Sequence, residues 1–230
     1  MGKRLAAVQS SYIPWKGYFD LINAVDEFVL LDDVQFTRRD WRNRNRIKTK
    51  DGPRWLTVPV HTKGRYREPL CSITISDPEW RQRHWRTIES SYRRARCFAR
   101  YASFFEELYH GATETHLSLL NYRFLHAITV LLGIETTLSW SMDYHLATGR
   151  NERLVELCSR VGATTYVSGP SAKAYLDLDL FRQRGIEVVF FEYSGYPPYD
   201  QLFPPFDHHV SVVDLILNVG ADAPQYLLTF

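Results

Sequence analysis

The chain has 230 residues, of which 45% are apolar, and it carries three cysteines and a formal net charge of +2. This length and apolar content provide a core that needs no disulfides or structural metal, and Cys71, Cys97 and Cys158 lie far apart and outside any CxxC or CxxH pattern. No apolar run is long enough for a signal peptide or a membrane span, so we expect a cytoplasmic protein without membrane contact.

The positive charge is concentrated in two stretches of the chain. One arginine-rich stretch covers residues 38–54 and a second covers 81–100, on an expected helix. Local basic patches attract phosphates or nucleic acid even where the net charge is small.

The first 33 residues predict a βαβ unit. The apolar runs at 4–9 and 27–33 indicate strands buried on both faces, which is typical of parallel sheets, and 17–24 suits a helix between them. The crossover of such a unit is nearly always right-handed.

The middle of the chain predicts a hairpin and a helical segment. Strand-like runs at 54–60 and 69–76 flank a basic, glycine-containing loop, which favours a β-hairpin. Helical spacing of large side chains over 78–111 and 113–132 predicts two packed helices, so 78–132 is expected to be a helical insertion or lobe.

The last third returns to alternating strands and helices. The expected elements are a strand at 134–140, a helix at 151–162, a strand at 164–169, a helix at 178–185, a strand at 186–193 and a helix at 211–220. This order predicts one α/β domain over 1–230, with a doubly wound, mainly parallel, Rossmann-like sheet, the helical insertion and the hairpin.

Three polar clusters follow expected strands. They are SSYIPWKGY at 10–18, DDVQFTRRDWRNRNRIK at 32–48 and SGPSAKAY at 168–175. Ligands of open α/β sheets bind beyond the carboxyl ends of the strands, so we expect the three clusters to converge on one pocket.

The first cluster is rich in aromatic and polar residues. Pro14 stiffens the turn, Gly17 permits close backbone approach, and the free amides at the helix start attract an anion. The candidate substrate-binding residues here are Gln9, Tyr12, Trp15, Lys16 and Tyr18. The alternative is that the aromatic rings merely cover the sheet, because the chain has neither a GxGxxG nor a GxxxxGK[ST] motif.

The second cluster begins with a carboxylate pair. Asp32 and Asp33 end an apolar strand, where they could hold Mg²⁺, orient a hydroxyl or accept a proton, so both are candidate catalytic residues. One of them could instead cap the following turn.

The arginines that follow alternate with asparagine and tryptophan. This pattern supplies forked donors for phosphate and an aromatic surface for stacking. The candidate binding residues are Arg38, Arg44, Arg46 and Lys48. A polynucleotide patch, a small-nucleotide clamp and a salt-bridged surface loop all remain open.

The late part of the chain adds further candidates. Those preceding or within the loop after 164–169 are Ser168, Gly169, Ser171 and Tyr175, and those in the proline-rich turn before the last helix are Tyr199 and Gln201. The first group suits a phosphate or carboxylate. No metal site is expected, since the adjacent His208 and His209 rarely share one coordination direction and no third ligand is obvious.

The chain resembles the WbqC-like protein family. The resemblance is carried, in order, by QSSYIPWKGYFDLI, FVLLDDVQFTRRDWRNRNRIKT, WLTVPV, NERLVELCSRVGATTYVSGPSAKAYLD, YDQLFPPF and SVVDLILNVG. It implies a place in bacterial O-antigen or related biosynthesis and a glycine transferase role, and the matching Glu152 and Arg153 keep binding by those two residues open.

The leading hypothesis is a transferase that joins an activated amino acid, such as glycine, to an amine on an acceptor such as a nucleotide-linked amino sugar. Asp32 or Asp33 would deprotonate the amine, and Arg44 and Arg46 would hold phosphates. The donor could be aminoacyl-tRNA, a carrier-protein thioester or an ATP-made adenylate. The alternatives are an ATP-dependent ligase or nucleotidyl transferase using ATP and Mg²⁺, and a non-enzymatic nucleic-acid-binding protein.

Overall fold

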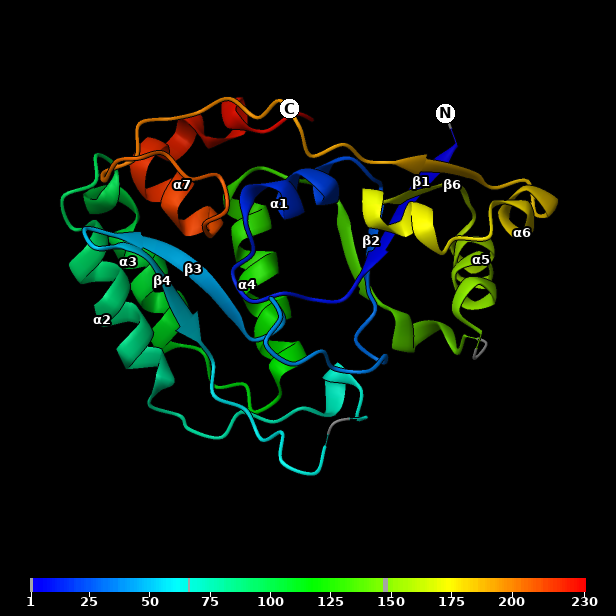
Figure 1. Cartoon of the computed structure of the whole chain (residues 1–230), viewed down its shortest axis with the longest axis horizontal. Coiled ribbons are helices and arrows are strands. Elements are labelled where there is room, and N and C mark those ends of the chain that lie inside the picture. Colours follow the sequence, from blue (N-terminus) through cyan, green and yellow to red (C-terminus); the bar gives the residue numbers. More distant parts are fainter. Residues whose placement is uncertain (1, 66, 147–148) are drawn as a thin grey trace.

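The protein is described by a computed structural model that covers residues 2–65, 67–146 and 149–230. Within these residues, a parallel five-stranded sheet has the order β5-β2-β1-β6-β7 (Figure 1). Its strands are β1 (Lys3–Val8), β2 (Glu27–Leu30), β5 (Thr137–Trp140), β6 (Ala163–Ser168) and β7 (Glu187–Phe190). The predicted doubly wound α/β sheet is confirmed, with the chain direction across the sheet reversing between β1 and β6.

Helices cover both faces of this sheet. Helices α1 (Lys16–Asn23) and α4 (Leu117–Leu131) lie on one face, and α5 (Arg150–Val161) and α6 (Leu178–Gln183) lie on the other (Figure 1). Successive residues of β1 divide between the two layers, because Ala6 belongs to the core of the first face while Leu5 and Ala7 belong to that of the second. Burial on both faces explains the apolar runs of the central strands β1 and β2.

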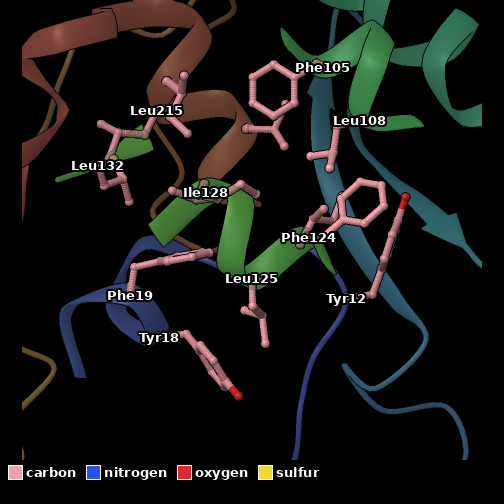
Figure 2. Close-up of a cluster of buried hydrophobic side chains, with 14 of the residues drawn as sticks. Tyr12, Tyr18, Phe19, Phe105, Leu108, Phe124, Leu125, Ile128, Leu132 and Leu215 are labelled. Atoms are coloured by element: carbon pink, nitrogen blue, oxygen red, sulfur yellow. The ribbon is translucent and has the colours of Figure 1, made fainter. Parts of the chain in front are cut away.

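Helix α4 lies at the centre of the larger core. Phe124, Leu125 and Ile128 are fully buried, and Figure 2 shows them between the aromatic residues of the α1 region and Phe105 of α3 (Phe98–His110). Helix α4 therefore contributes to the same core as Ala6 of β1 and Phe28 of β2.

The hairpin lies earlier in the chain than expected. It joins β3 (Arg44–Thr49) and β4 (Gly52–Thr57) as an antiparallel pair. The predicted strands at 54–60 and 69–76 do not form this hairpin, although they meet at an isolated antiparallel bridge between Val60 and Ile75. The charged residues of the first strand made it resemble a surface loop, although buried Asn45 and Ile47 alternate with the half-buried Arg44 and Arg46. The turn residues are Lys50 and Asp51, and Gly52, which begins β4, has a φ of 101°.

The expected helix at 78–111 is two helices. α2 (Trp80–Tyr92) ends before 93–97, and α3 follows, so the single helix is wrong. The intervening residues offer the core only Ala95, and the amide of Cys97 donates to the Leu217 carbonyl of α7 (Val212–Val219).

Short 3-10 helices complete the structure: η1 (Leu70–Ser72), η2 (Ser141–Tyr144), η3 (Pro170–Ala174) and η4 (Gly220–Tyr226). None of the helices in the described residues has the length and apolar character that crossing a membrane requires. The assignment of 1–230 to one domain, with 78–132 as an insertion, stays a prediction.

Candidate functional site

A cavity of about 830 Å³ opens at the carboxyl ends of β1 and β6, where the sheet order reverses. This is the position at which open α/β sheets bind ligands. Its polar lining among the described residues consists of Gln9, Gln35, Arg42, Arg150, Arg153, Tyr166, Ser168, Ser171, Tyr175 and Tyr193, together with the backbone at Gly169. Five of the predicted binding residues are thus brought together, from the first and third polar clusters.

Three arginines of the described chain line this cavity, and no aspartate or glutamate does so. Arg153 Nη2 donates to Asp33 Oδ2 at 2.5 Å, and the Arg150 guanidinium lies 3.5 Å from the ring centroid of Tyr175. Arg42 Nη1 donates to the Gln9 carbonyl at 2.6 Å and to Ser11 Oγ at 3.0 Å. Positioned guanidinium groups of this kind suit phosphate or carboxylate ligands.

Asp32 is not part of the lining of either cavity. The side chain is fully buried, with Oδ1 accepting from the Ser10 amide at 2.8 Å and Oδ2 from Ser118 Oγ of α4 at 2.5 Å. Burial raises the pKa of Asp32, against the opposing effect of these hydrogen bonds. Asp32 therefore joins the loop after β1 to α4.

Asp33 is more accessible than its neighbour. Its side chain is 27% exposed, and it accepts from Ser141 Oγ at 2.5 Å as well as from Arg153. The two carboxylates thus have different partners. Among the described residues, no group of three or more His, Cys, Asp or Glu side chains is arranged to hold a metal ion.

A second cavity of about 360 Å³ adjoins the first, sharing Val8 and Arg42 with it. Its other described lining residues are Ser11, Pro14, Trp15, Tyr18, Trp41, Asn45, Arg46 and His209. The predicted residues Trp15, Tyr18 and Arg46 therefore lie at this smaller cavity.

Tyr12 points away from both cavities. Its hydroxyl lies 2.9 Å from His84 Nδ1 and 2.8 Å from the Tyr109 hydroxyl, and Figure 2 shows its ring beside Phe124. Burial raises the pKa of Tyr12. Ile13, the next residue, has φ of 36°, an unusual value for a β-branched residue, and the chain turns there before reaching Trp15.

Four other candidates lie in buried polar contacts outside the cavities. Tyr199 and Gln201 donate to Asp214 Oδ1 at 2.7 and 2.9 Å, and Lys48 Nζ donates to Gln201 Oε1 at 2.5 Å. Lys16 Nζ donates to the Pro197 carbonyl at 3.1 Å, and burial lowers the pKa of Lys16 to about 8. These contacts hold the segment around 197–205 against the hairpin and α7.

The remaining arginines are on the surface. Arg38 is exposed near Thr57 and Val58, and the Arg44 guanidinium lies 4.2 Å from the ring centroid of Trp55. Exposed arginines of the second basic stretch lie on and after α2, on the side of the molecule opposite α5 and α6 (Figure 1).

Sequence reasoning did not single out Arg42, Arg150, Trp41 or Tyr193 as site residues. Arg42 and Trp41 lie in the charged run at 38–48, in which no local sequence pattern distinguishes the residues that line a cavity from those on the surface. Arg150 directly opens α5, beside Arg153, which only the family resemblance marked.

The chain matches the model of the WbqC-like protein family over residues 9–226. It is 51% identical over 225 residues to Rv1507c of Mycobacterium tuberculosis, an uncharacterized protein, covering 98% of this chain and 97% of that protein. No solved structure matches the chain. Because the family model spans nearly the whole sequence, the chain belongs to the WbqC-like protein family.

Proposed function

We propose that the protein is a transferase of bacterial O-antigen or related biosynthesis. It binds a phosphorylated acceptor, a nucleotide-linked amino sugar, in the larger cavity and joins an activated amino acid to the amine of that sugar. Glycine is the amino acid favoured by the family resemblance. Aminoacyl-tRNA, a carrier-protein thioester and an adenylate remain the candidate donors.

The observation that carries this proposal is the set of three guanidinium groups on one cavity at the reversal point of the sheet. Arg42 comes from the segment before β3, while Arg150 and Arg153 lie one helical turn apart at the start of α5. Arg153 is paired with Asp33 and Arg42 with Asp40, but no carboxylate lines the described part of the cavity, so the guanidinium groups give it a positive potential that favours a phosphorylated ligand. The hydroxyls of Ser168 and Ser171 add neutral hydrogen-bonding groups that suit a sugar.

The two carboxylates have different roles in this proposal. Asp33 is the group that accepts the proton of the attacking amine, because it is partly exposed and its partner Arg153 lines the cavity. Asp32 positions the loop after β1 through the Ser10 amide. Formation of the amide bond releases the carrier of the amino acid, and the amine proton passes to Asp33.

The test is amide formation by the purified protein. It is incubated with a UDP- or dTDP-amino sugar and with glycyl-tRNA, a glycyl thioester, or glycine with ATP and Mg²⁺, and the product mass is measured. We expect a glycyl-sugar amide with one donor, and loss of turnover in Asp33→Asn. The matched control Asp51→Asn changes an exposed aspartate whose side chain is 79% accessible and should retain activity.

An ATP-dependent ligase or nucleotidyl transferase is the second candidate, since the same arginines would suit a triphosphate. Release of pyrophosphate or phosphate from ATP with Mg²⁺, in the absence of any amino-acid donor other than the free acid, would support it. Absence of amide product with every donor would refute the first proposal.

A further inference from the structure

The smaller cavity has aromatic walls. Rings of Trp15, Tyr18, Trp41 and His209 border it, together with the polar side chains of Ser11, Arg42, Asn45 and Arg46. An apolar space of about 360 Å³ bordered by flat rings suits a flat heterocycle better than a hydrated sugar or a phosphate.

The Trp15 ring packs on the backbone of α1. A Cβ atom placed on Gly17 would lie 2.3 Å from Cζ2 of the indole, so the ring packs directly over this glycine. On its other sides the indole packs against Tyr193, Tyr196 and His209, with ring centroids 5.5 to 6.1 Å apart. The ring is therefore held in place before any ligand arrives.

Trp41 is also held by neighbouring groups, but it remains accessible. The Trp41 ring packs on Trp55 at a centroid distance of 5.3 Å, and Arg44 lies against the Trp55 ring. The Trp41 carbonyl accepts a hydrogen bond from the Tyr12 amide at 3.1 Å. The side chain is nevertheless 41% exposed. An exposed but fixed indole is the arrangement that proteins use to stack nucleobases.

The two cavities adjoin each other and share lining residues. Val8 and Arg42 border both, and Tyr193 of the larger cavity packs against Trp15 of the smaller one. A ligand with an anionic part and a flat ring can therefore occupy both, with Arg42 between them.

We propose that the smaller cavity binds the base of the nucleotide whose phosphates occupy the larger cavity, with Trp41 as the stacking surface. This inference rests on the proposed function and extends it, because it states that a nucleotide is recognised by its base as well as by its phosphates. The sugar and the amine then lie toward Ser168 and Asp33.

The experiment compares ligands that differ only in the base. Binding of UMP, AMP and ribose 5-phosphate to the full chain is measured by isothermal titration calorimetry. Base stacking on an aromatic side chain predicts that at least one nucleotide binds about tenfold or more tightly than ribose 5-phosphate. Trp41→Ala should remove this difference while leaving the affinity for ribose 5-phosphate within about twofold, and Trp41→Phe should keep most of it.

The control variants separate the two cavities. Phe230→Ala removes another exposed aromatic ring, 53% accessible, from the C-terminus and should leave all three affinities unchanged. Arg153→Gln should weaken UMP and ribose 5-phosphate alike, since both carry the phosphate.

Equal affinity for the nucleotides and ribose 5-phosphate, or a base preference that survives Trp41→Ala, would overturn the assignment of the smaller cavity while leaving the phosphate site intact. Ribose 5-phosphate binding that is lost in Arg153→Gln supports the proposed function by itself. Failure of all three ligands to bind would instead overturn both.

Discussion

The buried carboxylate of Asp32 allows a sharp test of how the site is built. Two donors converge on it, the Ser10 amide and Ser118 Oγ, and Asp32→Ala leaves both without this acceptor. A buried donor without a partner costs about 1–3 kcal/mol, so the two together cost about 2–6 kcal/mol. Because the change also removes the desolvation cost of the carboxylate, we expect a loss of about 2–4 kcal/mol, a large fraction of the stability of an ordinary domain.

Asp32→Asn should behave differently. The amide oxygen can still accept from Ser10, and the amide NH₂ can donate to the Ser118 hydroxyl, which then acts as acceptor. We expect this variant to remain within about 1 kcal/mol of the wild type. Urea unfolding of the wild type, both variants and the exposed control Asp51→Ala at pH 7 measures these differences.

The pH dependence gives a second readout of the same group. Burial raises the pKa of Asp32 in the folded protein, so between the unfolded and folded pKa values the folded state binds more protons. The contribution of Asp32 to stability therefore falls as the pH rises from about 4, and Asp32→Asn should lack this fall. Equal destabilisation by Asp32→Ala and Asp32→Asn, or a loss below about 1 kcal/mol in Asp32→Ala, would refute the hydrogen-bonding role. Intact folding with no turnover in Asp32→Asn would point instead to the predicted catalytic role.

Three further predictions follow from single contacts. Gly17→Ala should lower the free energy of unfolding by about 1–3 kcal/mol, because the added Cβ displaces the Trp15 ring, despite the better helix propensity of alanine. Thermal melts would show this loss, and an unchanged near-ultraviolet circular dichroism spectrum would argue against it. Burial lowers the pKa of Lys16 to about 8, so between pH 8 and 10.5 the folded state binds fewer protons than the unfolded state and stability rises with pH. Lys16→Met should remove this rise. Urea midpoints across this range, with Lys50→Met as the exposed control, would detect the difference, and parallel curves for wild type and Lys16→Met would contradict it. Tyr92→Phe removes a hydrogen bond of 2.7 Å to Asp214 and should lower the free energy of unfolding in urea by about 1–3 kcal/mol. An unchanged free energy of unfolding would mean that water replaces the hydroxyl.

Much of the fold could be predicted from local patterns. The strands β1, β2, β6 and β7 are short apolar runs, and α5 and α7 end at glycine, so their order already required a parallel sheet covered on both faces. The position of the hairpin was not predicted, because its first strand alternates buried residues with arginines, a pattern that also suits a surface loop.

The direction of side chains in loops was decided by tertiary structure. Tyr12 and Trp15 are three residues apart in the same turn, but one enters the core beside His84 and the other lines a cavity. Loops lack the regular periods of strands and helices, so their composition does not indicate which side chains face inward.

The sequence by itself determined much of the strand and helix order, the family and the edge of the sheet at which the larger cavity opens. Only the tertiary structure brought Arg42 together with Arg150 and Arg153, more than a hundred residues away along the chain, and buried Asp32. The physical reason is that burial periodicity is a local property of the chain, whereas the convergence of charged groups depends on which strands pair and on where each loop turns.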